Sequence, residues 1–175
     1  MTRELNLENF VDADFCGLHS IEPSNEVASA QSRTGYIIKL GGFPLIWKSQ
    51  LQSAVATSTM MAEYHALSSS LRAMIPIREL LVELADRMAL PAELQTSIRA
   101  NVHEDNNGAL LLTTNQRITA RTRHYNVNWH FFWQYVKDKV VNIVKVASEL
   151  QDADFLTKVL PRPSFEANRK RVMGW

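Results

Sequence analysis

The sequence predicts a mixed α/β fold. Three runs rich in β-branched and aromatic residues open the chain, a long stretch with helical spacing of apolar residues follows, and strand-like and helix-like segments then alternate. The length of 175 residues suits one domain that can bury a substantial core. We expect a single domain over 1–175, with a core at about 5–158 and a basic C-terminal helix at about 161–173.

The first part of the chain predicts three strands. Residues 5–15 form the first, with acidic residues near its end, and a polar loop over 17–31 follows. Residues 33–40 and 43–49 are rich in β-branched and aromatic residues and are joined by Gly41-Gly42. A glycine pair between two such runs is a strong hairpin signal.

A long helix is expected from Thr59 onward, with Ser58 or Thr59 as its N-cap. Apolar residues recur there at helical spacing: Met60, Tyr64, Leu67, Leu71 and Met74. Pro76 permits a kink or a restart, after which the pattern continues to a stop near Pro91.

The second half predicts alternating strands and helices. Residues 97–104 form a strand that leads to Asp105, and the next segments are predicted in turn. They are a short helix over 106–115, an aromatic-rich helix over 121–139, a strand over 140–147, a helix over 149–158, and, after Pro161 and Pro163, a basic tail helix.

Composition excludes several classes of protein. Hydrophobic residues make up 46% of the chain and charged residues 21%, as in ordinary globular proteins rather than disordered ones. No apolar run is long enough to span a bilayer, the N-terminus lacks a signal-peptide core, and the single cysteine, Cys16, excludes an internal disulfide. We therefore expect an intracellular protein without a membrane partner.

The net charge of +1 conceals an asymmetry. Residues 1–116 carry 8 Lys and Arg against 13 Asp and Glu, whereas residues 117–175 carry 11 against 5, so the two parts are −5 and +6. The basic part favours a polyanionic partner, and a solvated basic face is the alternative interpretation.

Four acidic residues stand at positions that suit a shared site: Asp12, Glu63, Asp105 and Asp154. Each has an alternative structural role, as a cap, as a charge near the positive end of a helix, or as a surface residue. If they converge, each close pair of carboxylates repels by about 4 kcal/mol at about 4 Å in a dielectric near 20, and a divalent cation would offset this. Oxygen ligands with few histidines favour Mg²⁺ or Mn²⁺ over zinc.

Six blocks carry a family resemblance that covers about residues 10–166. In order they read VDADFCG, RTGYIIKLGGFPLIWKSQLQ, AVATSTMMAEYHAL, HEDNNGALLL, ARTRHYNVNWHFFW and LQDADFLTKVLPRPSFE. They resemble the ribonuclease H domain of copia-type LTR retrotransposon polyproteins. The resemblance implies an α/β ribonuclease H-like fold whose five-stranded mixed sheet, with three antiparallel strands and then parallel strands, is flanked by helices.

The resemblance also implies an activity. It is endonucleolytic hydrolysis of the RNA strand of RNA–DNA hybrids with two Mg²⁺ or Mn²⁺ ions, giving 5′-phosphate and 3′-hydroxyl ends. It further implies a reverse transcriptase domain as a partner in a parent polyprotein, and a location in a cytoplasmic particle or the nucleus.

Roles are carried over residue by residue. Asp12, the first aspartate of DAD, resembles the metal-bridging ligand, and Asp14 beside it is the less suited of the two. Glu63 and Asp105 resemble the ligands of the metal at the leaving group. Asp154 resembles the ligand of the metal that activates water.

Substrate contacts are expected from two groups. Small polar residues near the carboxylates could read 2′-hydroxyl groups, with capping as the alternative for each: Ser58, Thr59, Asn106 and Asn107. A basic group could hold phosphates, with a solvated cluster as the alternative: Arg121, Arg123 and His124.

The chain departs from the family pattern at two places and from cellular ribonucleases H at a third. Met61 stands where the family commonly has glutamate, Asn107 stands where glutamine is usual, and no histidine lies between Val146 and Asp154. The missing histidine predicts slower product release or proton transfer. The first two departures keep open a domesticated or inactive remnant that binds nucleic acid or protein. An integrase or transposase is disfavoured because the blocks match ribonuclease H.

Overall fold

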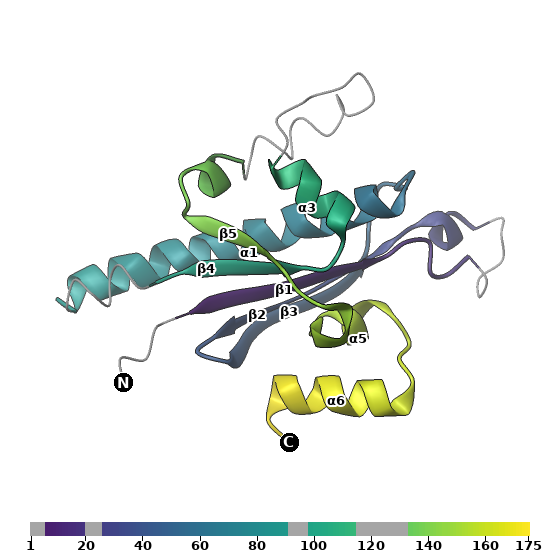
Figure 1. Ribbon diagram of the computed structural model, residues 1–175. Coiled ribbons are helices and arrows are strands. Elements are labelled where there is room, and N and C mark those ends of the chain that lie inside the picture. Colours follow the sequence, from purple (N-terminus) through teal and green to yellow (C-terminus); the bar gives the residue numbers. More distant parts are fainter. Residues whose placement is uncertain (1–5, 20–25, 91–97, 115–132) are drawn as a thin grey trace.

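A computed structural model describes residues 6–19, 26–90, 98–114 and 133–175 (Figure 1). Its strands are β1 (Leu7–Asp14), β2 (Arg33–Leu40), β3 (Phe43–Leu51), β4 (Ala100–Glu104) and β5 (Val141–Lys145). Its helices are α1 (Thr59–Arg87), α3 (Asn107–Thr114), α5 (Asp154–Thr157) and α6 (Arg162–Met173), with 3₁₀ turns at Val27–Ala30 and Ser148–Leu150. None of the helices in these ranges has the length and apolarity needed to cross a membrane.

The five strands form one mixed sheet in the order β3-β2-β1-β4-β5. The pairs β1–β2 and β2–β3 are antiparallel, whereas β1–β4 and β4–β5 are parallel. Helices α1 and α3 lie on one face of the sheet, and α5 and α6 lie on the other (Figure 1). The predicted α/β fold with a five-stranded mixed sheet is therefore confirmed.

The predicted hairpin connects β2 and β3. Gly41 and Gly42 have φ values of +58° and +87°, a region that residues with a Cβ rarely adopt. Two positive φ values in a two-residue loop are characteristic of the turn that matches strand twist. The glycine pair is therefore required by the backbone at this turn.

Helix α1 begins where the sequence predicts. Ser58 is the N-cap, and its hydroxyl oxygen accepts a hydrogen bond of 3.2 Å from the backbone N–H of Met61. The helix runs through Pro76 without a restart and ends at Arg87, a few residues before Pro91. Ala89 beyond this end has a φ of +49°, which stops the helical path.

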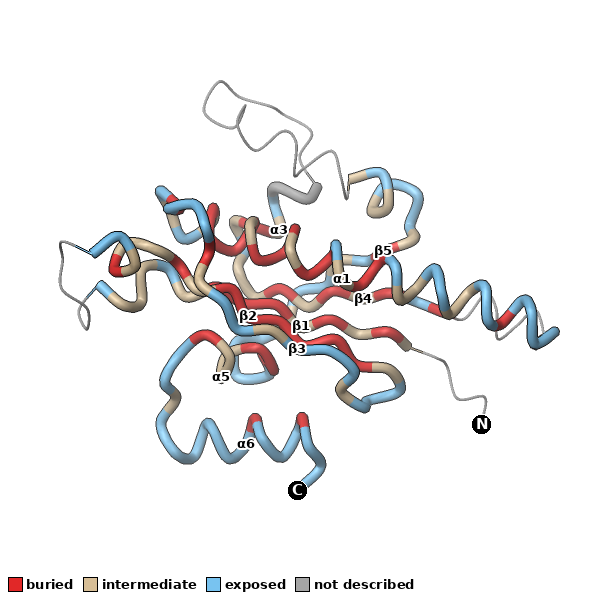
Figure 2. The backbone as a smooth tube through the Cα atoms, turned by 180° about the vertical axis from the view of Figure 1, so that it is seen from behind, coloured by how far each residue is buried: buried red, intermediate tan, exposed pale blue. Residues whose placement is uncertain are grey.

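The main core lies between α1 and the sheet. Figure 2 shows the central strands and the sheet-facing side of α1 as buried, whereas β3 and α6 are largely exposed. Fully burying one large aliphatic side chain contributes roughly 1.5–3 kcal/mol, so this layer supplies most of the hydrophobic stabilisation. Its largest completely buried members include Leu7, Val11, Ile38, Tyr64, Leu67, Leu71, Met74 and Val102.

The opposite face carries a buried ion network. Lys39 of β2 pairs with Asp152, and the Nε of Arg171 in α6 lies 2.8 Å from the other oxygen of Asp152. Lys39 and Asp152 are almost completely buried. The Lys39 ammonium also lies 4.9 Å from the centre of the Phe10 ring. The network attaches α6 to the underside of the sheet.

One predicted helix differs from the structure, and another lies mostly outside the described residues. The helix predicted over 149–158 is wrong in extent, because it is a 3₁₀ turn at Ser148–Leu150 followed by the four-residue α5. Gln151 explains the break, since its buried amide donates to the backbone carbonyl of Val11 at 2.8 Å. The helix predicted over 121–139 lies mostly outside the described residues, of which 133–137 are helical.

Candidate active site

Three acidic side chains meet at one edge of the sheet. Asp12 near the end of β1, Glu63 in the second turn of α1 and Asp105 just after β4 each offer an oxygen atom, and these atoms all lie within 4.8 Å of one another. β1 and β4 are parallel, so their carboxyl ends reach the same edge, and α1 begins above it. Residues 12, 63 and 105 are thus brought together by folding.

The site concentrates negative charge where water cannot compensate it. Asp12 is completely buried, and Glu63 is only 4% exposed. The Glu63 Oε2 atom has no hydrogen-bond partner among the described residues. Burial, with the neighbouring charges of Glu104 and Asp12, raises the pKa of Glu63 to about 10. These carboxylates need a proton or a cation to be stable together.

Glu104 is a further buried carboxylate in this region, and the sequence did not indicate it. It shares the α1-facing side of β4 with Ala100 and Val102, so the strand alternation places an acidic residue in a core position. One oxygen accepts a hydrogen bond of 3.0 Å from the backbone N–H of Asn106. Burial raises the pKa of Glu104 to about 8, although that hydrogen bond acts in the opposite direction.

Asp154 lies beside the three-residue group but is not a member of it. The ammonium of Lys158 stands between the two, 3.0 Å from Asp12 Oδ1 and 3.1 Å from Asp154 Oδ1. Burial raises the pKa of Asp154, against the effect of Lys158. Burial also opposes the charge on Lys158, but the attraction of Asp12 and Asp154 outweighs it and raises the lysine pKa.

Thr157 fixes the second oxygen of Asp12. Its hydroxyl donates to Asp12 Oδ2, and Thr157 Oγ1 also lies 3.0 Å from the backbone carbonyl of Asp154. This contact depends on Gly35, which pairs with Asp12 in the sheet register. A Cβ at position 35 would lie 2.5 Å from Thr157 Cγ2 and 2.9 Å from Leu156 Cβ. The missing side chain therefore allows α5 to approach the strand.

Asp105 is held from the other side of the cluster. Its Oδ2 accepts a hydrogen bond of 2.8 Å from the hydroxyl of Ser148, in the 3₁₀ turn after β5. A pair of amide contacts fixes the turn that follows, because Asn106 Oδ1 accepts from the backbone N–H groups of Gly108 and Ala109 at 2.8 and 3.1 Å. The carboxylate is therefore oriented before any ligand binds.

The donor set fits a hard divalent cation. It consists of carboxylate oxygens, which Mg²⁺ and Mn²⁺ prefer, and the buried Glu63 Oε2 lacks any other partner in the described structure. Asp12, Glu63 and Asp105 could hold one ion. Asp12 and Asp154 lie on either side of the ammonium of Lys158.

The residues predicted to contact substrate fall into three groups: helix caps, exposed residues at helix starts, and residues outside the described ranges. Ser58 and Asn106 use their side-chain oxygens as helix caps, which is the alternative role considered from the sequence. Thr59 and Asn107 are exposed at the starts of α1 and α3. The predicted phosphate-binding residues Arg121, Arg123 and His124 lie outside the described residues.

The family departure at Met61 has a structural explanation. The Met61 side chain is 8% exposed and belongs to the core cluster, and its sulfur lies 3.2 Å from the backbone nitrogen of Thr57. A glutamate there would add another carboxylate next to Glu63. The methionine instead contributes apolar packing under the start of α1.

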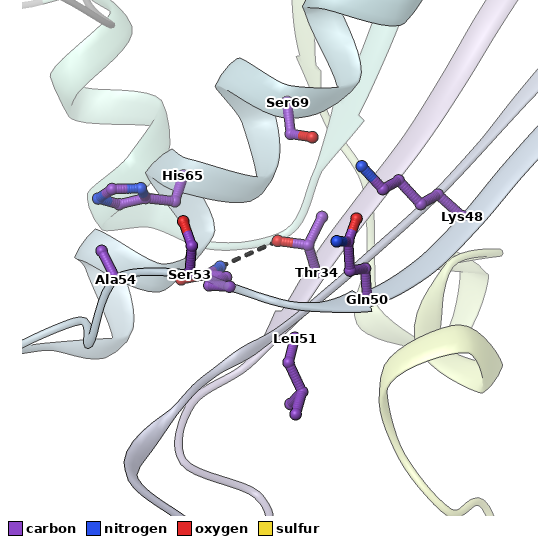
Figure 3. Close-up of a pocket in the computed structure, with 9 residues that line it drawn as sticks. Thr34, Lys48, Gln50, Leu51, Ser53, Ala54, His65 and Ser69 are labelled. Atoms are coloured by element: carbon purple, nitrogen blue, oxygen red, sulfur yellow. Dashed lines mark hydrogen bonds between the residues drawn. The ribbon is translucent and has the colours of Figure 1, made fainter. Parts of the chain in front are cut away.

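A polar pocket of about 300 Å³ lies apart from the carboxylates (Figure 3). Lys48 of β3 points into it from the sheet, and His65 and Ser69 border it from α1. Gln52 also lines it, and its side-chain amide donates to Thr34 Oγ1 at 3.0 Å. None of the described residues that line this pocket is acidic, so Lys48 is a cationic side chain in a pocket without carboxylates from the described part of the chain.

The raised carboxyl pKa values predict that stability without metal falls as pH rises. Between pH 5 and 8 the folded protein keeps protons on Glu63 and Glu104 that the unfolded chain has lost, because the folded pKa values of about 10 and about 8 exceed the ordinary value of 4.5. Each such proton lowers the free energy of unfolding by about 1.4 kcal/mol per pH unit. Denaturant titrations in the presence of a chelator would measure this slope.

A matched variant and metal supply the controls for the pH prediction. Glu104→Gln should reduce the slope by about one proton, and saturating Mg²⁺ should flatten it because a cation favours the ionised forms. Metal-free stability that is constant or increases from pH 5 to 8 would contradict the prediction.

The chain is similar to parts of transposon polyproteins. It is 31% identical over 166 residues to the retrovirus-related Pol polyprotein from transposon TNT 1-94 of Nicotiana tabacum, covering 95% of this chain and 11% of the polyprotein. It is 32% identical over 162 residues to that of transposon RE1 of Arabidopsis thaliana, covering 93% and 10%. The chain thus spans about a tenth of these relatives. No protein-family model matches it.

Solved structures identify the fold. LC11-RNase H1, isolated from compost, superposes with a TM-score of 0.52 at 15% identity, over 87% of this chain and 92% of that one. The same enzyme in complex with an RNA/DNA hybrid gives a TM-score of 0.51 at 16% identity, over 86% and 93%. The chain is therefore homologous to a segment of the Pol polyproteins of plant retrotransposons and has the ribonuclease H fold, as the sequence resemblance predicts.

Proposed function

We propose that this protein hydrolyses the RNA strand of RNA–DNA hybrids. The observation that carries the proposal is the convergence of Asp12, Glu63 and Asp105 at the carboxyl edge of a ribonuclease H-like sheet. Buried carboxylates at such distances are unfavourable in a purely structural role, since each burial cost is increased by repulsion from its neighbours. A site for divalent cations accounts for them.

Four carboxylates would serve as the metal ligands in this reaction. Asp12, held by Thr157, offers its oxygens to both ion positions. Glu63 and Asp105 complete the position nearer the core, and Asp154 completes the outer one. Two bound Mg²⁺ or Mn²⁺ ions supply a water of lowered pKa and charge stabilisation at the departing 3′-oxygen, which yields 5′-phosphate and 3′-hydroxyl ends.

The protein's own contribution is orientation. Asp12 and Glu63 stand on a strand and a long helix, and hydrogen bonds from Ser148 and Thr157 hold Asp105 and Asp12 before the substrate arrives. A rigid carboxylate frame suits a reaction that needs a water and a phosphate in line.

Substrate recognition is assigned to polar groups around this frame. The hydroxyl proton of Ser58 and the amide nitrogen of Asn106 are left to donate, because their capping contacts use only oxygen lone pairs. Thr59 and Asn107 are exposed beside them. Contacts to 2′-hydroxyl groups would select RNA in one strand. The proposed phosphate contacts are Arg121, Arg123 and His124. The proposed protein partner is a reverse transcriptase domain of a parent polyprotein.

A cleavage assay tests the function. With Mg²⁺ or Mn²⁺, a hybrid labelled on its RNA strand should be cut internally to products with 5′-phosphate ends, and chelation should abolish the reaction. The same RNA in single-stranded form and a DNA duplex are the controls. Hybrid binding without cleavage in either metal would favour the inactive remnant. Cutting of DNA ends alone would favour an integrase-type enzyme.

A further inference from the structure

The position of Lys158 carries an inference that rests on the proposed function. Its ammonium lies 3.0 Å from Asp12 Oδ1 and 3.1 Å from Asp154 Oδ1, so it bridges the two carboxylates that flank the outer ion position. The Lys158 side chain is 40% exposed, whereas that of Asp12 is 1% exposed and that of Asp154 16%. The ammonium therefore enters the site from the solvent side.

A bound divalent ion and this ammonium would compete for the same oxygens. Mg²⁺ requires oxygen ligands at about 2.0–2.1 Å in strict octahedral geometry, and two cations confined between the same two carboxylates repel each other strongly. Asp12 Oδ1 faces Lys158 and Oδ2 accepts from Thr157, so an ion at the outer position would compete with the ammonium for Oδ1. The outer ion and the Lys158 ammonium cannot occupy this position together.

The local structure allows Lys158 to leave without disturbing the carboxylates. Lys158 follows the last residue of α5 with an extended backbone (φ −122°, ψ 152°), and its backbone N–H remains bonded to the carbonyl of Asp154. Thr157 holds Asp12 independently of the lysine. The flexible four-carbon stem of a lysine can move its charge into solvent by side-chain rotation alone.

We infer that Lys158 is an exchangeable internal counter-ion, whose ammonium fills the Asp12–Asp154 position in the metal-free protein and leaves when the second divalent ion enters. Loading then occurs in two unequal steps. The position formed by Asp12, Glu63 and Asp105 fills first, and the outer position fills at higher concentration because each ion must displace the ammonium.

Calorimetric titration with Mg²⁺, compared between the parent, Lys158→Gln and Lys48→Gln, tests this inference. Lys158→Gln should bind the second ion at least about tenfold more tightly, with first-ion affinity within about threefold of the parent and a lower melting temperature in chelator. Lys48→Gln is the matched control, since it removes one positive charge from a half-buried lysine in a pocket without carboxylates. It should change neither affinity. Unchanged or weaker second-ion binding in Lys158→Gln would overturn the inference.

A measurement on the unmodified sequence keeps the test independent of folding. The acylation rate of each lysine, followed by mass spectrometry, should rise at least fivefold for Lys158 at saturating Mg²⁺ and stay constant for Lys48. A Lys158 rate that stays level or falls would overturn the inference. Neither readout uses hybrid cleavage, so an inactive protein that still shows the exchange would refute the proposed function and not the counter-ion role.

Discussion

An Asp12→Asn variant is expected to lose metal-dependent hybrid cleavage by at least about a thousandfold while remaining folded. Asp12 is the carboxylate common to both proposed ion positions. Asparagine keeps its shape and can still accept from Thr157, but it removes the charge that both ions share. Loss of several kcal/mol of charge stabilisation corresponds to about three powers of ten in rate. Single-turnover cleavage at saturating Mg²⁺ would measure it.

The stability of this variant separates a catalytic from a structural effect. Removing one negative charge relieves repulsion on Glu63 but also removes the ion pair with Lys158, which keeps its contact with Asp154. The melting temperature in chelator should therefore stay close to that of the parent, and the increase caused by Mg²⁺ should shrink. Asp14→Asn, the same change two residues along β1, should keep its rate within about fivefold. Parental cleavage by Asp12→Asn would remove Asp12 from the proposed machinery.

An Asp152→Ala variant is expected to lose about 3–5 kcal/mol of folding free energy. Asp152 accepts contacts from Lys39 and Arg171, and the Lys39 side chain is only 6% exposed. Removing one partner of a buried pair leaves an uncompensated charge, which costs more than the pair itself contributes. For a chain of this size the melting temperature should fall by roughly 10 °C or more. Denaturant and thermal unfolding would measure both quantities.

Two further variants test whether the loss of folding free energy comes from the buried ion network. Glu166→Ala removes an exposed ion pair with Arg162 in the same helix and should cost less than about 1 kcal/mol. Adding Lys39→Met to Asp152→Ala should recover part of the stability, because the unpaired charge is removed. An Asp152→Ala protein as stable as Glu166→Ala would show that the network does not anchor α6.

Local patterns predicted most elements of the fold, because the signals are local. The glycine pair at 41 and 42 and the Ser58 cap depend on neighbouring residues only, and both lie where expected. The break in the helix predicted over 149–158 depends on Gln151 reaching the carbonyl of Val11 across 140 positions of sequence. Spacing along one element cannot indicate such a contact.

In the candidate site, too, features that depend on local sequence were predictable, and contacts made only in three dimensions were not. Asp12, Glu63 and Asp105 meet because parallel strands end at one edge, which the predicted topology implies. Glu104 was overlooked as a strand residue, although the alternation of β4 places it in the core. Lys158 could have been found from its spacing of four residues from Asp154, since such pairs meet on one face of a helix. Its contact with Asp12 is visible only in three dimensions.

The bare backbone at Gly35 makes the two sides of the acidic site depend on different layers of the protein. Glu63 is carried by α1 over the apolar core and Asp105 by the end of β4, whereas Asp154 and Lys158 belong to a single helical turn that packs against Gly35. A methyl group at position 35 would displace that turn, and with it the contact of Thr157 with Asp12, while Glu63 and Asp105 would stay in place. The proposed inner ion position therefore depends on the core of the molecule, whereas the proposed outer one depends on how closely α5 packs against the strand at Gly35.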